Sequence, residues 1–308
     1  MKIPAIFLFT ILISGSAGAQ NIELVSPDLN PFQNIRDFCI SPHGEEAYFT
    51  VQSPGQDLSQ IVRVKNKKWK NPELLPFCDG YSYLEPFLSG DGKRLYFASD
   101  RPKTSSDTLK SDFDIWYVER KDKNSEWSEP INIGAPVNSE NDEFYPTLSD
   151  NNNLYFTMDA KSGLGKDDIY YCQWNGKEYS APVLLSTQIN SGGYEFNAFI
   201  SRDERILIYT KYDAKDGFGS GDLYLSKKDE KGEWQTAQNL GNTINTRYME
   251  YCPFYDSQTE TLYFTSRRNH LSPRKFRNLK DYQSYISGSE NGSSKIYKTR
   301  VKLQDVVN

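Results

Sequence analysis

One pattern of alternating apolar and polar residues recurs five times along the chain. The centre of each copy is a short β-rich segment of aromatic, aliphatic and hydroxyl residues, found at 46–50, 94–98, 153–157, 206–210 and 261–265. The copies stand roughly 48 to 59 residues apart, a period typical of arrays whose unit is one small sheet. One small sheet cannot bury both of its faces alone, so we expect the units to stack on one another.

The third copy shows the strands of one unit most clearly. Residues 143–149 read as a first strand, the turn residues at 150–152 end it, and residues 154–158 read as a second strand. A glycine-rich stretch then leads to a third strand at 168–172, and residues 179–185 follow as a fourth. Four antiparallel strands in one unit predict a propeller blade.

The repeats predict an all-β propeller with five blades, in a single domain over residues 20–308. The blades fall roughly at 31–77, 78–138, 139–190, 191–245 and 246–303. The last copy has no clear fourth strand, whereas residues 22–30 resemble the end of the second copy. We therefore expect the N-terminal segment to complete the last blade and to hide the two sheet edges of an open ring.

Residues 1–19 have the composition of a secretory signal peptide. Lys2 precedes an apolar run at 6–13, and small residues up to Ala19 provide a cleavage site. The run is shorter than the ~20 residues of a membrane-spanning helix, and no later stretch is long enough either. The sequence thus predicts an exported protein with no transmembrane segment, placed in the periplasm or at the cell surface or outside a Gram-negative-type bacterium.

The amino-acid composition argues against several classes of partner and cofactor for this protein. The net charge of −5 argues against a nucleic-acid-binding protein, which should carry an excess of Lys and Arg. Two histidines and the lack of a C-x-x-C motif argue against a structural zinc site, and we expect neither a metal nor a cofactor. The four cysteines permit disulfides in an exported chain but also fit four small buried thiols, which we favour. They are Cys39, Cys78, Cys172 and Cys252.

Several segments of the repeat resemble the repeat of a known protein family. Residues 88–101 followed by Asp114-Ile115-Trp116, and the glycine-rich segments 163–170 and 217–224, are similar to the TolB-like, WD-type propeller repeat of bacterial envelope proteins. The resemblance implies the propeller fold and a place in the envelope. It implies no catalytic residues, because the family shares a scaffold and not a common catalytic set. TolB itself has six blades and a preceding α/β domain, and this chain shows five repeats without such a domain.

The longest loop, residues 267–294, combines cations with aromatic residues on an otherwise acidic chain. One interpretation is a solvated insertion. The other is a contact for an acidic partner, either an envelope protein or an anionic glycan, since Arg and Lys recognise carboxylates and phosphates. The candidate binding residues are Arg267, Arg268, Arg274, Lys275, Arg277, Lys280, Tyr282 and Tyr285, accompanied by His270 and Phe276.

A second group of candidates consists of carboxylates. Glu143, Glu195 and Glu250 open the innermost strand in three successive repeats, and Asp37 and Glu85 lie nearby but out of register. Some five-bladed propellers are glycosidases, which need a pair of carboxyl groups ~5 to 9 Å apart. A residue that follows the repeat fits one repeated structural hydrogen bond better than catalysis. The sequence therefore favours an exported, non-catalytic binding protein, with a carbohydrate-active enzyme as the alternative; the oligomeric state stays open.

Overall fold

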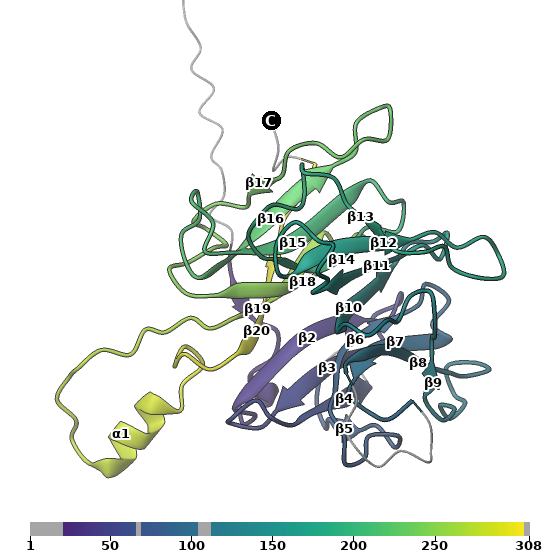
Figure 1. Ribbon diagram of the computed structural model, residues 1–308. Coiled ribbons are helices and arrows are strands. Elements are labelled where there is room, and N and C mark those ends of the chain that lie inside the picture. The colour runs from purple at the N-terminus through teal and green to yellow at the C-terminus, as the bar shows by residue number, and fades with distance from the viewer. Residues whose placement is uncertain (1–20, 66–68, 104–111, 305–308) are drawn as a thin grey trace, which may run out of the picture.

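The computed structural model describes residues 21–65, 69–103 and 112–304, and the predicted signal peptide lies outside them. The strands form five four-stranded antiparallel sheets, seen from one side in Figure 1. The innermost strands contact one another in a closed cycle, from the first sheet through the fifth and back to the first. The predicted five-bladed propeller is confirmed.

Each blade repeats the same order of strands. The first two blades contain β2 (Asn34–Ile40), β3 (Glu46–Gln52), β4 (Ser59–Lys65) and β5 (Glu73–Leu74), then β6 (Tyr83–Leu88), β7 (Arg94–Ser99), β8 (Asp114–Glu119) and β9 (Ile131–Asn132). The third and fourth contain β10 (Glu143–Leu148), β11 (Leu154–Met158), β12 (Asp168–Cys172) and β13 (Val183–Leu184), then β14 (Glu195–Ile200), β15 (Ile206–Tyr212), β16 (Gly221–Lys227) and β17 (Gln238–Asn239). The fifth contains β18 (Glu250–Asp256), β19 (Thr261–Ser266) and β20 (Lys295–Arg300).

The N-terminal segment completes the fifth blade, as the sequence predicts. The short strand β1 (Glu23–Leu24) pairs antiparallel with β20, and the Val25 N–H continues the ladder by donating to the Ile296 carbonyl at 2.9 Å. A 3-10 turn, η1 (Pro27–Leu29), follows at once and buries Leu29 against the first blade. The ring is thus closed by hydrogen bonds between the two ends of the chain.

Side chains from neighbouring blades interlock to form the core. The second strands are buried almost throughout, because both faces of each sheet are covered by adjacent blades. Trp127 of the second blade packs edge-on against Tyr48 of the first at 6.3 Å between ring centroids, so this aromatic residue packs between blades. All four cysteines carry free thiols, three of them buried.

The ring has two faces of different character. One face, which we call the hairpin face, carries the tight turns that join the first and second strands of each blade. The other, the loop face, carries the loops between second and third strands and the loops that enter each blade. The loop between β19 and β20 leaves the ring as an arm that bears α1 (Leu279–Ile286), which projects beyond the blades in Figure 1.

No helix in the described ranges is long and apolar enough to cross a membrane.

Candidate functional site

Five side chains of different chemistry meet at the axis of the ring. Each belongs to a β-bulge at the same place in an innermost strand, where the register with the second strand shifts. All five adopt the left-handed backbone conformation, with φ between 51° and 62°, which costs a non-glycine residue about 1 to 3 kcal/mol. We call them the axial residues: Asp37, Glu85, Tyr145, Asn197 and Cys252.

The bulges connect each blade to the preceding one. A bulge frees the backbone N–H from its own ladder, and in three blades that N–H donates to a threonine hydroxyl on the second strand of the blade before it. These bonds run from Asp37 to Thr265 (3.4 Å), from Glu85 to Thr50 (3.1 Å) and from Asn197 to Thr157 (3.1 Å). The strain of the bulge is therefore offset in part by interblade hydrogen bonds.

Glu85 replaces a threonine that the second blade lacks. Ala98 stands at the position that Thr50 occupies in the first blade, so the second blade offers no hydroxyl there. The N–H of Tyr145 donates instead to Glu85 Oε2 at 2.7 Å. Glu85 therefore has a structural role, as the acceptor for the Tyr145 N–H, that does not depend on a substrate.

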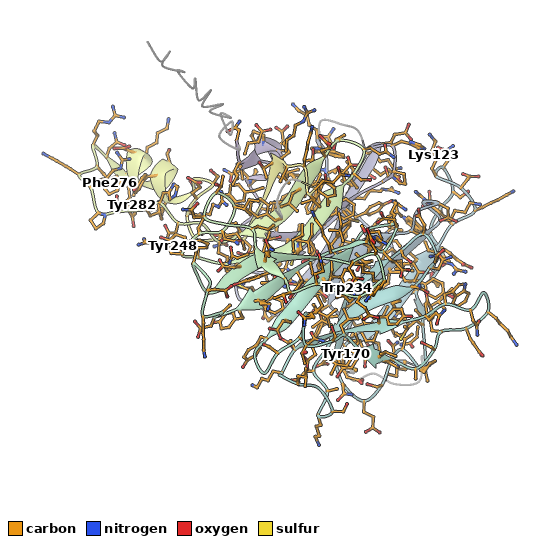
Figure 2. The ribbon with its side chains drawn as sticks, turned by 90° about the horizontal axis from the view of Figure 1, so that it is seen from above. Lys123, Tyr170, Trp234, Tyr248, Phe276 and Tyr282 are labelled. Carbon is orange, nitrogen blue, oxygen red and sulfur yellow. The ribbon has the colours of Figure 1, made fainter. Side chains whose placement is uncertain are left out.

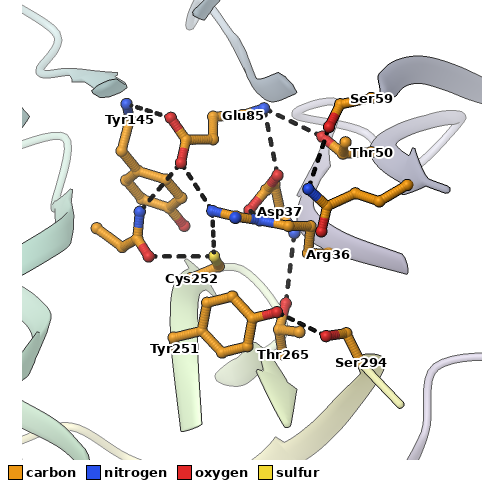
Figure 3. Close-up of polar contacts among 12 residues, drawn as sticks. Arg36, Asp37, Thr50, Ser59, Glu85, Tyr145, Tyr251, Cys252, Thr265 and Ser294 are labelled. Atoms are coloured by element: carbon orange, nitrogen blue, oxygen red, sulfur yellow. Dashed lines mark hydrogen bonds and ion pairs between the residues drawn. The ribbon is translucent and has the colours of Figure 1, made fainter. Parts of the chain in front are cut away.

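Arg36 bridges the two axial carboxylates, as Figure 3 shows. Its guanidinium donates to Asp37 Oδ1 at 2.6 Å and to Glu85 Oε1 at 2.7 Å. The carboxylate side chains are only 1% and 3% exposed. Burial raises the pKa of Glu85 to about 7, while the Arg36 charge opposes that rise. The same guanidinium also reaches Cys252 Sγ at 3.4 Å.

Side chains fill the channel beside this cluster. The Tyr145 hydroxyl spans to the fifth blade and donates to the Pro253 carbonyl at 2.9 Å. The cavity among Asp37, Glu85 and Tyr145 measures about 10 Å³, the space of one water molecule. A sugar ring does not fit between the axial carboxylates in this arrangement.

The repeated glutamates Glu143, Glu195 and Glu250 lie toward the loop face, each bonded within its own blade. Glu143 Oε1 accepts from Ser139 Oγ at 2.5 Å and from the Ser139 N–H at 3.2 Å. Glu195 binds the N–H and hydroxyl of Ser191 in the same way. Glu250 repeats the pattern with Thr246 and adds Ser266 and Arg268. The residue four positions earlier is the partner in all three cases, so each glutamate fastens the loop that enters its strand.

Burial shifts these glutamates toward the protonated form. It raises the pKa of Glu143 to about 7, with the Ser139 hydrogen bonds acting in the opposite direction, and it also raises the pKa values of Glu195 and Glu250. Between about pH 4.5 and 7 the folded protein then binds more protons than the unfolded chain. The free energy of unfolding consequently falls as the pH rises through this window.

Glu143→Gln should flatten this pH dependence. We expect the wild-type protein to lose on the order of 1 to 3 kcal/mol of unfolding free energy between pH 5 and pH 8, and the variant to lose less, because its amide cannot ionise. Chemical denaturation across that range measures the difference, with the exposed Glu178→Gln as the matched control. Equal slopes for Glu143→Gln and wild type would contradict the assignment; Glu85 accounts for part of the remaining slope.

Aspartates at the start of the third strands hold the loop-face loops in place. Asp168 Oδ2 accepts from the N–H groups of Leu164 and Gly165 at 2.7 and 3.0 Å, and Asp222 binds the corresponding loop of the next blade. A Cβ atom at Gly163 would lie 2.2 Å from the Asp168 carboxylate, which explains the glycine at that position. These hydrogen bonds fix the backbone of the loops, so the side chains of the loops project from defined positions.

Exposed apolar side chains concentrate on the loop face and the arm. Of the ten large hydrophobic residues exposed in the described part of the chain, only Leu74 and Val183 lie on outermost strands. Four others form what we call the platform, over the third and fourth blades: Leu164, Tyr194, Tyr212 and Phe218. Leu58 lies on the loop face of the first blade, and Leu279, Tyr282 and Ile286 lie on α1.

The predicted binding residues fall into two groups, one at the root of the arm and one farther out along it. Arg268 is 7% exposed, donates to the Ile244 carbonyl at 2.6 Å and stacks on Tyr297, so it belongs to the packing of the fifth blade. Arg267 bonds to Ser294 and Gln56 at the root of the arm. The remaining candidates lie farther out on the arm: Arg274, Lys275, Arg277, Lys280, Tyr282 and Tyr285. Their roles in binding stay predictions.

A cavity of about 470 Å³ lies at the hairpin-face end of the axis. Phe87, Phe199 and Phe254 line it, and their rings pack together with centroids 5.2 Å (Phe199–Phe254) and 6.3 Å (Phe87–Phe254) apart. Acidic residues such as Asp203 and Asp256 lie at its edge. This cavity is on the opposite side of the ring from the platform, so the two features can be tested separately.

Solved structures share this fold at low sequence identity. The chain matches a putative TolB from Agrobacterium tumefaciens with a TM-score of 0.50 and 11% identity, covering 88% of this chain and 91% of that one. It matches the α-L-arabinofuranosidase of Podospora anserina, solved with cellotriose, with a TM-score of 0.54 and 11% identity, covering 91% and 95%. Against TolB from Acinetobacter baumannii the TM-score is 0.46 at 9% identity, and the chain spans only 54% of that protein.

These likenesses confirm the TolB-like propeller fold, which a putative TolB and an α-L-arabinofuranosidase share. No family model and no curated protein sequence matches the chain.

Proposed function

We propose that this protein is an exported, non-catalytic binding protein that uses the loop face of its propeller to contact a protein or glycan partner. The predicted signal peptide supports export to the periplasm or the cell surface, and the acidic net charge supports a partner other than nucleic acid. The observation that carries the proposal is the concentration of exposed apolar side chains on the loop face. Patches of this kind on a water-soluble surface mark interaction sites.

The platform has the composition of a contact surface. The rings of Tyr194 and Tyr212 meet edge to face at 5.8 Å, and the Lys166 ammonium lies 5.8 Å from the centroid of Tyr194. The Tyr212 N–H donates to the Tyr194 carbonyl at 3.1 Å, which links the end of β15 to the loop before β14. Tyrosines fixed in this way offer a large apolar area at little cost in conformational entropy, and they suit both protein and sugar partners.

Removing the platform should weaken capture of the partner without unfolding the ring. We expect the double variant Tyr212→Ser/Phe218→Ser to recover at least tenfold less of a discrete partner in crosslinked capture from envelope extract. The control Leu74→Ser/Val183→Ser removes side chains that are at least as exposed but lie on outermost strands, and it should recover the wild-type amount. Equal recovery by the two double variants would contradict a binding role for the platform.

The alternative, a carbohydrate-active enzyme, draws its support from the shared fold. Its candidate residues Glu143, Glu195 and Glu250 are each engaged by a hydroxyl and an N–H of their own loop. The axial pair Asp37 and Glu85 is bridged by Arg36, with space for about one water molecule beside it. A glycosidase needs room for a sugar between its carboxyl groups. Unchanged binding of the partner by the three Glu→Gln variants is expected if binding is the function.

A further inference from the structure

The arm between β19 and β20 is anchored to the ring at its base and free of it at its tip. At the base, the Tyr248 hydroxyl donates to the Asn269 carbonyl at 2.6 Å, and Asn269 forms an antiparallel bridge with Asn291. Farther out, none of the residues of α1 is buried. Figure 2 shows Phe276 and Tyr282 at one extremity of the molecule, well away from the blades.

The helix is held by contacts within the arm. The side chain of Asn278 caps its first turn by accepting from the Asp281 N–H at 2.9 Å. Asp281 in turn binds the Arg274 guanidinium at 3.2 Å and the Arg277 N–H at 3.0 Å. An isolated helix of eight residues is unstable in water, so these contacts are what fixes its shape.

Tyr285 holds the same side of the helix against the arm one turn farther along. The Tyr285 hydroxyl accepts from the Ser272 N–H at 2.8 Å, and the Arg274 guanidinium lies 4.3 Å from the centre of the Tyr285 ring. Asp281 and Tyr285 are four residues apart and share one side of the helix. That side is therefore occupied by the arm's own loop.

The outward side of the helix is an apolar ridge. Leu279, Tyr282 and Ile286 are spaced i, i+3, i+7 and lie on one face, and they are 67%, 43% and 39% exposed. The half-buried Phe276 ring packs between Tyr282 (5.0 Å) and Tyr285 (5.5 Å) and lengthens the ridge at its edge. The arm's loop covers Asp281 and Tyr285, whereas the exposed parts of Leu279, Tyr282 and Ile286 remain available to another molecule.

Positive charge flanks this ridge. Residues 267–294 contain six Arg or Lys against two acidic residues, on a chain whose total charge is −5. Both acids have partners within the arm, since Asp281 binds Arg274 and Glu290 binds His270 at 2.6 Å. Lys275 and Lys280 are exposed and directly adjoin Phe276 and Leu279 in the sequence. A partner with acidic side chains next to an apolar groove would complement both features.

We propose that the arm is a preformed recognition helix that inserts its ridge of Phe276, Leu279, Tyr282 and Ile286 into an apolar groove on a protein partner, with Lys275 and Lys280 facing acidic residues at the groove's edge. Anchors at i, i+3 and i+7 are the spacing by which a helix occupies a groove. The contacts within the arm reduce the conformational entropy that the helix loses on binding, because the helix is already formed. This inference rests on the proposed function and names the class of its partner.

Photo-crosslinking from two positions separates the arm from the rest of the loop face. A photoreactive phenylalanine at Gln283 lies on the ridge side of α1 and leaves the four ridge residues intact, while one at Phe218 reports the platform. Both are introduced into the full chain in the cells that make it. We expect position 283 to yield an adduct with another protein. The yield should fall at least tenfold in Leu279→Ser/Ile286→Ser and in Lys275→Glu/Lys280→Glu, and it should persist in Ser284→Asn.

Each of the following outcomes would overturn the proposal that the arm binds a protein groove. An adduct at 283 with a second copy of this chain or with lipid assigns the ridge to a different occupant, and an adduct insensitive to the ridge or charge variants removes their role. An adduct at 218 with none at 283 rejects the arm and leaves the platform in place. Adducts at neither position reject the proposed function as well. Unchanged thermal unfolding of each variant shows that the ring is intact.

Discussion

Replacing Arg36 with methionine is expected to destabilise the protein by about 3 to 5 kcal/mol, the cost of leaving a buried charge without its partner. Arg36 is the cation between Asp37 and Glu85, whose side chains are 1% and 3% exposed. Methionine keeps much of the side-chain volume and removes the charge. Urea denaturation at neutral pH measures the loss.

The pH and a compensating variant show whether charge is the cause. Glu85 can bind a proton more readily once Arg36 is absent, so Arg36→Met should cost less at pH 5 than at pH 8. The triple variant Arg36→Met/Asp37→Asn/Glu85→Gln removes all three charges and should recover part of the lost stability. A change within about 1 kcal/mol for Arg36→Met would show that the axial cluster is not an important ion-pair network.

Deleting residues 22–25 is expected to open the ring. The deletion removes β1, its pairing with β20 and the buried Val25, and it exposes the edge of the fifth blade. Loss of one buried valine and of several ladder hydrogen bonds should cost about 3 to 5 kcal/mol. The exposed edge should also promote aggregation.

A chain that begins at Ile22 provides the control, because it keeps β1. Thermal unfolding and size-exclusion chromatography of the two chains, compared at equal concentration, measure the effect. A monomer of unchanged stability without residues 22–25 would contradict closure by the N-terminal strand.

The repeat in the sequence was sufficient to predict the blades, because their strands follow local rules. In the third blade, β11 and β12 begin and end at the predicted residues, and tight turns separate the strands as expected. The predicted fourth strand was too long, since only Val183–Leu184 pairs with β12. An outermost strand has few partners, so hydrophobic pattern specifies its ends weakly.

The axial residues were harder to predict, because a bulge changes which side chain faces the centre. The repeated Glu143 marks the start of the strand, but the axial position is two residues later, at Tyr145. Asp37 and Glu85 stood out of register with the repeated glutamates for this reason. Their offset is visible in the sequence, but the bulge that explains it is not. Arg36 was missed, since nothing local marks an arginine as the partner of a carboxylate 49 residues away.

The helix of the arm was also missed, although the sequence contained two signals for it. Asn278 precedes Asp281 by three residues, the spacing of a helix N-cap. Leu279, Tyr282 and Ile286 then follow helical spacing. The charge of this loop predicts a role for its cations, but two of them, Arg267 and Arg268, bind within the propeller at the root of the arm.

Side-chain footprinting in living cells tests most directly whether the loop face is the binding surface. The labelling of each residue by hydroxyl radicals is compared between the purified protein and the protein in the cells that make it. Tyr212, Phe218 and Tyr282 should be labelled several-fold less in cells, whereas Tyr255 on the hairpin face should be labelled equally in both. Equal labelling everywhere, or protection confined to Tyr255 and the hairpin face, would contradict a partner on the loop face.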